Sequence, residues 1–134
     1  MSESNMMRQI MLEVSKIGTR IFRFNTGLAW AGRVQRWPEP TQTMVYPGDV
    51  VIRRAYPIHF GVEGGSDLIG WTPVNGKAVF TAIEVKTLNG KTEKERLKKQ
   101  ENFIQQVNDS GGIGIMAHSP EEAVEFINKR KILD

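Results

Sequence analysis

Three ionisable residues, Asp67, Glu84 and Lys86, stand in stretches of sequence that otherwise have the composition of β-strands. Glu84 and Lys86 are two positions apart in a segment rich in β-forming residues, so both side chains point to the same face of the predicted strand. Asp67 opens the preceding predicted strand, after a pair of glycines that frees the backbone to bend. If the two strands pair through a turn at Asn75-Gly76, Asp67 and Glu84 converge on one point.

Two carboxylates that meet in this way suit a hard divalent cation. Oxygen ligands favour Mg²⁺ or Mn²⁺ over zinc, and the Val85 carbonyl is a candidate third ligand. Lys86 would then orient or help to deprotonate an attacking water, or offset charge that develops on a phosphate. The alternative is a Glu-x-Lys pair on a solvated edge of a sheet, with Asp67 only capping a turn, and Glu-x-Lys met alone favours that alternative. The glycine-flanked Asp, the hairpin and the apolar strand together favour the metal site.

The elements predicted around these residues follow the order helix, strands, helix, strand, helix. Apolar residues at helical spacing predict a first helix over 5–17, ended by Gly18. A second helix is predicted from Thr92, as its N-cap, to Asn108, and a third helix from Ser119. Short apolar or alternating runs predict strands at 21–24, 67–71, 78–86 and 113–117. This order predicts a mixed α/β fold around a small sheet.

Prolines interrupt the region between the first predicted strand and Asp67. Trp37-Pro38-Glu39-Pro40 and Tyr46-Pro47-Gly48 predict an irregular excursion or a loose hairpin over 32–48. Val50 to Ile52 is a candidate short strand, and Gly61 to Gly65 is expected to be a loop.

Length and composition limit the classes of protein that need consideration. The 134 residues suffice for a single domain, 1–134, with the 40% hydrophobic and 25% charged residues of an ordinary globular protein. No apolar run approaches the roughly 20 residues that span a bilayer, and no secretory signal is visible. The lack of cysteine excludes disulfide and thiolate chemistry and favours an intracellular, cytoplasmic protein. The net charge of +3 mildly favours a polyanionic partner.

Gly65-Ser66-Asp67 followed by Ile83-Glu84-Val85-Lys86 resembles the bipartite motif of the PD-(D/E)XK nuclease superfamily. The fuller pattern is similar to the virus-type replication-repair nuclease (VRR-NUC) family, in its stand-alone phage and bacterial form. The similarity extends from the N-terminal helix through Phe22-Arg23-Phe24-Asn25-Thr26-Gly27 and includes Gln100, Phe103 and Gly111-Gly112. Ser66 departs from the superfamily's name, which has proline there, and the region 32–60 is the part that the family core explains least.

This resemblance implies a restriction-endonuclease-like fold, in which helices flank a mixed β-sheet with an αβββαβ core and an inserted hairpin or loop. It implies a DNA endonuclease that uses Mg²⁺ or Mn²⁺, with Gln100 near the catalytic centre. It also implies an acidic residue on the first helix, for which Glu3 and Glu13 are candidates. Helical geometry favours Glu3, which falls in the middle of the apolar face, whereas Glu13 lies at its edge. The residues expected to bind the metal are therefore Glu3, Asp67, Glu84 and, through its carbonyl, Val85.

Basic residues near the predicted site are candidates for contact with DNA. The run 91–99 is typical of a solvated helix face, but beside a nuclease site we expect Lys94, Lys98 and Lys99 to contact phosphates. Arg23, in a segment that carries the resemblance, is a further candidate.

Stand-alone members of the resembling family are similar to junction-cutting enzymes that work as homodimers, which implies branched, Holliday-junction-like DNA as the substrate. We expect the segment from Trp30 to His59 to form the dimer contact, because its apolar and aromatic residues exceed what a nuclease core needs. The alternative is that this segment folds back over its own sheet. Alternatives for the function are a flap or nicking nuclease that acts as a monomer, a non-catalytic DNA-binding module, and an interaction domain whose acidic pair is only surface.

Overall fold

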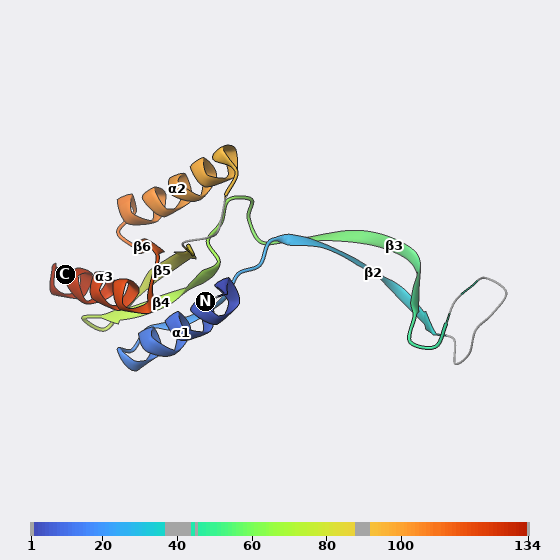
Figure 1. Cartoon of the computed structure of the whole chain (residues 1–134), viewed down its shortest axis with the longest axis horizontal. Helices are drawn as coiled ribbons and strands as arrows, with labels where there is room; N and C mark the ends of the chain where they lie inside the picture. Colours follow the sequence, from blue (N-terminus) through green and yellow to red (C-terminus); the bar gives the residue numbers. More distant parts are fainter. Residues whose placement is uncertain (1, 37–43, 45, 88–91, 134) are drawn as a thin grey trace. The chain divides into compact units, whose positions relative to one another are not determined.

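A computed structural model describes residues 2–36, 44, 46–87 and 92–133 of the chain. The chain forms two compact units, one built from Met1–Asn25 with Val62–Asp134 and the other from Thr26–Gly61 (Figure 1). The first unit contains the sheet and the helices, and the second is a two-stranded ribbon.

The first unit is built around a four-stranded sheet with the order β1-β4-β5-β6. Its strands are β1 (Arg20–Arg23), β4 (Leu68–Val74), β5 (Lys77–Val85) and β6 (Ile113–Ala117). β4 pairs antiparallel with β1 and β5, whereas β6 pairs parallel with β5. The turn between β4 and β5 has positive φ at both Asn75 and Gly76, as a type I′ hairpin turn requires. The hairpin that brings Asp67 toward Glu84 therefore forms at the predicted turn.

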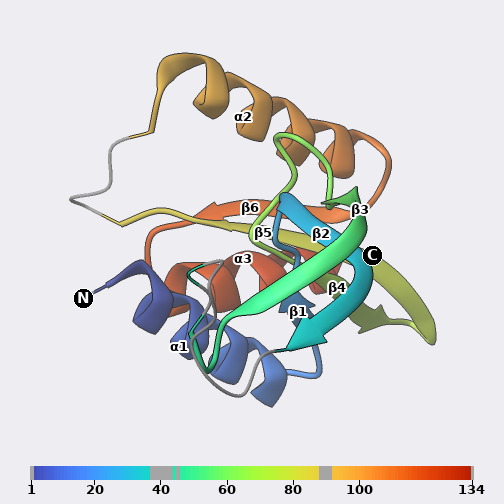
Figure 2. The ribbon, with the colours of Figure 1, turned by 90° about the vertical axis from the view of Figure 1, so that its right-hand side faces the viewer.

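Three helices cover the two faces of this sheet: α1 (Glu3–Lys16), α2 (Lys94–Asp109) and α3 (Pro120–Leu133). Figure 2 shows α2 on one side of the sheet and α1 with α3 on the other. The buried core lies under α1 and α3 and contains Met7, Ile10, Val14, Leu68, Ile83, Val85, Ile113, Ile115, Ala117, Ala123 and Ile127. The prediction of a restriction-endonuclease-like mixed sheet flanked by helices is confirmed. Within the described residues, every helix falls short of the length and apolarity that crossing a membrane demands.

Capping side chains explain where two of the helices begin. Ser2 accepts a hydrogen bond from the Asn5 backbone N–H at 3.2 Å, and Ser119 accepts one from the Glu122 N–H at 3.1 Å, as the sequence predicted for the third helix. The second helix differs from the prediction. Its N-cap is Glu93, which makes no side-chain capping bond, so the assignment of that position to Thr92 was wrong. The Thr92 hydroxyl is engaged by Lys86 instead.

The second unit is an antiparallel ribbon of β2 (Gly27–Arg36) and β3 (Val50–Phe60). Its register runs from Gly27 opposite Phe60 to Arg36 opposite Val50. The predicted loose hairpin is thus longer and more regular than expected, because the short strand foreseen at 50–52 continues for eight further residues of β3. Pro57 fits within β3 because each strand of a two-stranded ribbon has a free edge that needs no donor. The proline-rich residues 37–43 lie outside the described part of the chain.

Candidate active site

Asp67 and Glu84 lie side by side at one end of the β4–β5 hairpin, because Leu68 pairs with Ile83 in the antiparallel register. Each carboxylate accepts a hydrogen bond from the other strand's backbone. The Asp67 N–H donates to Glu84 Oε2 at 3.2 Å, and the Val85 N–H donates to Asp67 Oδ2 at 2.8 Å. The two acidic side chains are therefore positioned by the sheet itself rather than by a loop.

Burial makes the Glu84 carboxylate an unusual group. The residue is 2% exposed, and this burial, together with the nearby Asp67 carboxylate, raises the pKa of Glu84 to about 7, against a smaller lowering effect of Lys86. A buried carboxylate that shares its site with a second one is stabilised in its charged form by a cation. Mg²⁺ is commonly held by one or two carboxylates and completes its coordination with water and substrate phosphates, so this donor set fits such an ion.

The Lys86 ammonium is held in place from two directions. The residue directly follows β5, and its backbone N–H donates to the Ala117 carbonyl at 2.9 Å, which extends the pairing with β6. Its Nζ donates to Gln100 Oε1 at 2.6 Å and to Thr92 Oγ1 at 3.0 Å. Nζ also lies 3.7 Å from Glu84 Oε1. The positive charge thus stands directly beside the carboxylate pair.

Gln100 and Thr92 are the side chains that orient Lys86. Gln100 comes from α2 and is only 6% exposed, so its interaction with Lys86 takes place in a largely dry environment. The family resemblance implies that Gln100 lies near the centre, whereas the sequence predicts Thr92 only as a helix cap. Its placement six residues after Lys86 carries no sequence signal for this contact, which depends on how the segment before α2 returns to the sheet.

The acidic residue predicted on the first helix is Glu3, the first residue of α1, and it is exposed. Arg23 Nη2 donates to Ser4 Oγ at 3.4 Å, and Arg23 pairs in register with Leu68. The start of α1 therefore lies at the same end of the sheet as Asp67. Within the part of the chain that the structure describes, no three acidic, His or Cys side chains form a metal-binding group. Glu3 stays a predicted ligand.

Glu13 lies ten residues further along α1, about 15 Å away at the helical rise. It accepts a hydrogen bond from Lys16 at 2.9 Å. Between the two carboxylates considered for the first helix, position therefore favours Glu3.

The remaining predicted residues of the same unit differ in exposure, since the three lysines of α2 are exposed and Val85 is buried. Lys94, Lys98 and Lys99 lie on the solvent side of α2, and Lys99 forms an ion pair with Glu63, a residue that the sequence had not singled out. Val85 uses its N–H for Asp67, and a ligand role for its carbonyl stays a prediction. Ser66 is 1% exposed, and its hydroxyl finds no hydrogen-bond partner among the described residues.

A mixed sheet that presents an Asp at the start of one strand and Glu-x-Lys at the end of the next defines a nuclease of the PD-(D/E)XK type. The VRR-NUC domain family matches residues 53–121, just over half of the chain, and the chain belongs to this family. The matched region includes Asp67, Glu84, Lys86 and Gln100. The protein is therefore a nuclease with DNA as its substrate, of a type that generally uses a divalent metal. Neither a curated protein nor a solved structure matches the sequence.

Proposed function

We propose that this nuclease is an endonuclease that hydrolyses phosphodiester bonds in branched DNA, with Mg²⁺ or Mn²⁺ as its cofactor. The observation that carries the proposal is the convergence of Asp67, Glu84 and Lys86 in one hydrogen-bonded site at the end of the sheet. We expect the protein to act inside the cell.

In this proposal Asp67 and Glu84 hold the metal, joined by Glu3 and the Val85 carbonyl. A bound divalent ion supplies a Lewis acid that stabilises charge on the phosphate and lowers the pKa of a coordinated water. The protein's own contribution is to keep both carboxylates fixed through the backbone of the opposite strand. Substrate phosphates are expected to enter beside them, guided by Arg23, Lys94, Lys98 and Lys99.

Lys86 is the residue suited to act on the attacking water or on the phosphate. An ammonium group has three N–H donors. Two of them point to Gln100 and Thr92, which leaves one N–H for a water or a phosphate oxygen. Because Gln100 and Thr92 fix the rotation of the ammonium, that third donor has a defined direction, which is the preorganisation that charge stabilisation in a transition state requires.

Cleavage assays in Mg²⁺ and Mn²⁺ on linear, flapped, splayed and four-way DNA test the proposed activity. Asp67→Asn and Glu84→Gln should each abolish cleavage and leave DNA binding intact. Asp109→Asn is the matched control, since it removes an exposed carboxylate at the far end of α2. Cleavage at the wild-type rate by either active-site variant would show that the site is wrongly assigned. A wild-type protein that binds all four substrates and cuts none would be a non-catalytic DNA-binding module.

A homodimer is the proposed assembly because resolving a four-way junction needs two cuts, and a two-fold axis supplies two identical centres in antiparallel relation. The ribbon offers the apolar surface for such a contact. Trp30 is 56% exposed and Tyr56 is 58% exposed, with Leu28, Ile58 and Phe60 also exposed nearby. The register places Leu28 and Trp30 on one face of the ribbon and Tyr56, Ile58 and Phe60 on the other. A two-stranded ribbon is only marginally stable in water, so a partner that covers either face would stabilise it.

Light scattering at micromolar concentration should give twice the 15.1 kDa mass of the chain. Trp30→Ser combined with Tyr56→Ser should shift the protein toward the monomer and slow the cutting of four-way junctions more than that of flaps. A strictly monomeric wild-type protein would rule out junction resolution by a dimer and favour a flap or nicking nuclease.

A further inference from the structure

Arginines meet one another on the half of the ribbon that follows Gly32 in β2. Arg33 lies directly opposite Arg53 in the register, and both are exposed. Like charges at directly opposed positions of an antiparallel pair destabilise it. Among the described residues, neither guanidinium forms an ion pair with a carboxylate. Asp49 is the acidic residue of this unit that the structure describes. Its carboxylate accepts a hydrogen bond from the Tyr46 backbone N–H.

A β-bulge adds Arg54 to the same cluster. The register passes from Ala31 opposite Tyr56 to Arg33 opposite Arg53, so Gly32 faces two residues of β3, Arg54 and Ala55. In a regular strand Arg53 and Arg54 would point to opposite faces. Arg54 instead has φ +51, a left-handed conformation that is unfavourable for a residue with a side chain. Strained backbone of this kind is concentrated at functional sites.

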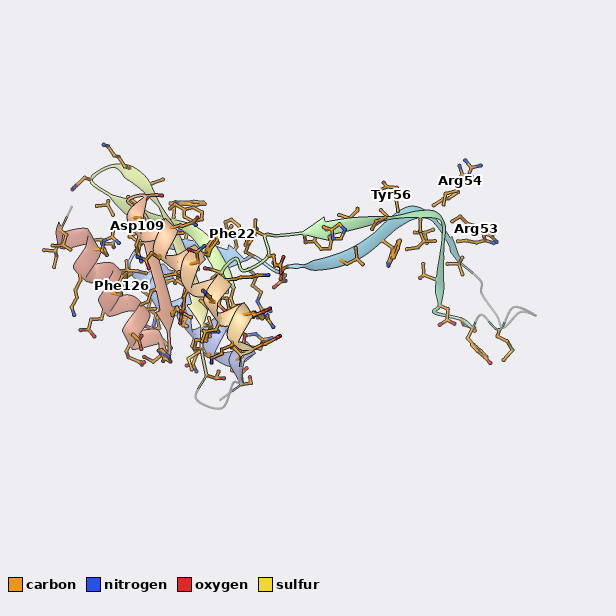
Figure 3. All side chains as sticks on the ribbon, turned by 90° about the horizontal axis from the view of Figure 1, so that it is seen from above. Phe22, Arg53, Arg54, Tyr56, Asp109 and Phe126 are labelled. Atoms are coloured by element: carbon orange, nitrogen blue, oxygen red, sulfur yellow. The ribbon has the colours of Figure 1, made fainter. Side chains whose placement is uncertain are left out.

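The bulge gathers the consecutive arginines around one hollow. This hollow of about 630 Å³ is lined by Arg33, Gln35, Arg53 and Arg54. Figure 3 shows Arg53 and Arg54 together at the bend of the ribbon, directed outward. Gln35 Oε1 accepts a hydrogen bond from Arg53 Nε at 2.7 Å, which orients that guanidinium and leaves its outer N–H groups for a ligand.

Gly32 is required for this arrangement. A Cβ at this position would lie 2.7 Å from the Arg53 carbonyl oxygen and 2.7 Å from Ile52 Cγ2. Since neither atom is the flexible end of a long side chain, the strands approach this closely only with glycine. The bulge and the arginine cluster therefore depend on the same residue.

The chemistry of the cluster favours phosphates as its ligand. Residues 26–61 contain four arginines and no lysine, and their acidic residues are Glu39 and Asp49. Arginine presents a planar fork of N–H donors that matches phosphate oxygens, and closely spaced phosphates offset the repulsion between neighbouring guanidiniums. A two-stranded ribbon also has the width that the major groove of DNA admits.

We propose that the β2–β3 ribbon is a DNA-binding arm, with Arg33, Arg53 and Arg54 as contacts to backbone phosphates. The inference rests on the proposed function in taking DNA as the polyanion. It adds a second contact surface, separate from the carboxylate site and from the lysines of α2.

Fluorescence anisotropy in EDTA, where no cleavage is expected, tests the arm. The triple variant R33Q/R53Q/R54Q should bind a labelled four-way junction about tenfold or more weakly near physiological salt. Its slope of log affinity against log salt, from about 50 to about 300 mM, should fall by about 2 to 3, because each phosphate contact contributes about 0.9. The control K16Q/K77Q/K129Q removes the same charge from exposed positions at the other end of the sheet from Glu84. An unchanged slope in the arginine variant, or an equal fall in the control, would overturn the inference.

A second measurement avoids altering the arginines. The chain has no cysteine, so Val51→Cys, opposite Gln35 and on the same face of the ribbon as Arg33 and Arg53, gives a unique site for a photo-crosslinker. It should crosslink to DNA, whereas Ile132→Cys at the end of α3 should not. The lack of a crosslink from position 51 would also overturn the inference. A protein that crosslinks through its arm but cuts no DNA would instead contradict the proposed endonuclease and leave the arm in place.

Discussion

In the unit that contains the sheet, the charged groups of interest are buried and bonded to one another, whereas in the ribbon they are exposed and face one another. Glu84 is 2% exposed and is held by the backbone of Asp67, and Lys86 is held by Gln100 and Thr92. Arg33 and Arg53 are directly opposed in the ribbon. Like-signed groups are therefore close together in both units, Asp67 with Glu84 in one and the arginines in the other.

The difference shows what each arrangement is suited for. Carboxylates in a dry site with fixed geometry suit chemistry, since the interactions are strong and need no reorganisation. Exposed arginines on a narrow ribbon suit recognition of a large polyanion, because they remain accessible to it. Since salt screens exposed charges, such binding depends on the salt concentration. In both units the proposed partner has the opposite charge and would relieve the repulsion, a cation for the carboxylates and phosphates for the arginines.

The largest effect is expected from removing the charge at the buried site. Glu84→Gln should lower the cleavage rate by about 1000-fold or more. In EDTA it should also stabilise the protein in a pH-dependent way. The folded protein holds the Glu84 proton with a pKa of about 7 against 4.5 for the ordinary group, so stability from this carboxyl is complete below pH 4.5 and is lost as pH rises through 7.

Glu84→Gln has no carboxyl proton to release, so its stability does not fall in this way as pH rises. Its melting temperature should exceed that of the wild type by a few degrees near pH 8, a gain on the order of 1–3 kcal/mol, and should match the wild type at about pH 4.5. Melting curves at both pH values check the sign. A gain that is larger in acid than in base would contradict the buried, proton-binding state of Glu84.

The second-largest effect on cleavage is expected from removing the hydrogen-bond acceptor that orients Lys86. Gln100→Leu removes the hydrogen bond to Nζ and should reduce kcat by about 10- to 100-fold with little change in KM, because the substrate contacts remain. Gln100→Glu keeps an acceptor and should restore part of the rate, and Thr92→Val should have a smaller effect than Gln100→Leu. Steady-state cleavage kinetics measure all three. A rise in KM alone would assign Gln100 to DNA binding rather than to the positioning of Lys86.

Separating the two units gives a direct test of their independence. Gly27 and Phe60 pair in register, so a short glycine linker can replace residues 27–60. Because the whole buried core cluster belongs to the other unit, the shortened chain should still unfold cooperatively, within a few degrees of the full chain. It should lose dimerisation and the high-affinity, salt-sensitive part of DNA binding. Failure of the shortened chain to fold would mean that residues 1–134 form a single cooperative domain.

The smallest effect is expected from the lysines of α2. Neutralising Lys94, Lys98 and Lys99 should weaken DNA binding only a few-fold and lower the salt slope by about 1 to 2. The effect should be smaller than that of the ribbon arginines because Lys99 already pairs with Glu63. Anisotropy titrations side by side with R33Q/R53Q/R54Q compare the two basic surfaces. A larger loss from the lysines would reverse the order of importance proposed here.

Predictions from sequence succeeded where the signal is local. The Asn75-Gly76 turn, the common face of Glu84 and Lys86 and the Ser119 cap each depend on a few adjacent residues, and each has the expected structure. The ribbon was less predictable. Its length depends on pairing between strands separated by the proline-rich region, and no local periodicity distinguishes such a pairing from an irregular loop.

The sequence by itself determined the order of elements, the family and the pairing of two acids with one lysine, because these follow from short-range patterns of residue type and from strand geometry. Only the tertiary structure decided which side chains orient Lys86, how far burial raises the Glu84 pKa, and that Arg54 at the bulge lines the same hollow as Arg53. Each of these depends on contacts between segments distant in sequence. Packing, desolvation and strand register set such contacts, and the local sequence does not encode them.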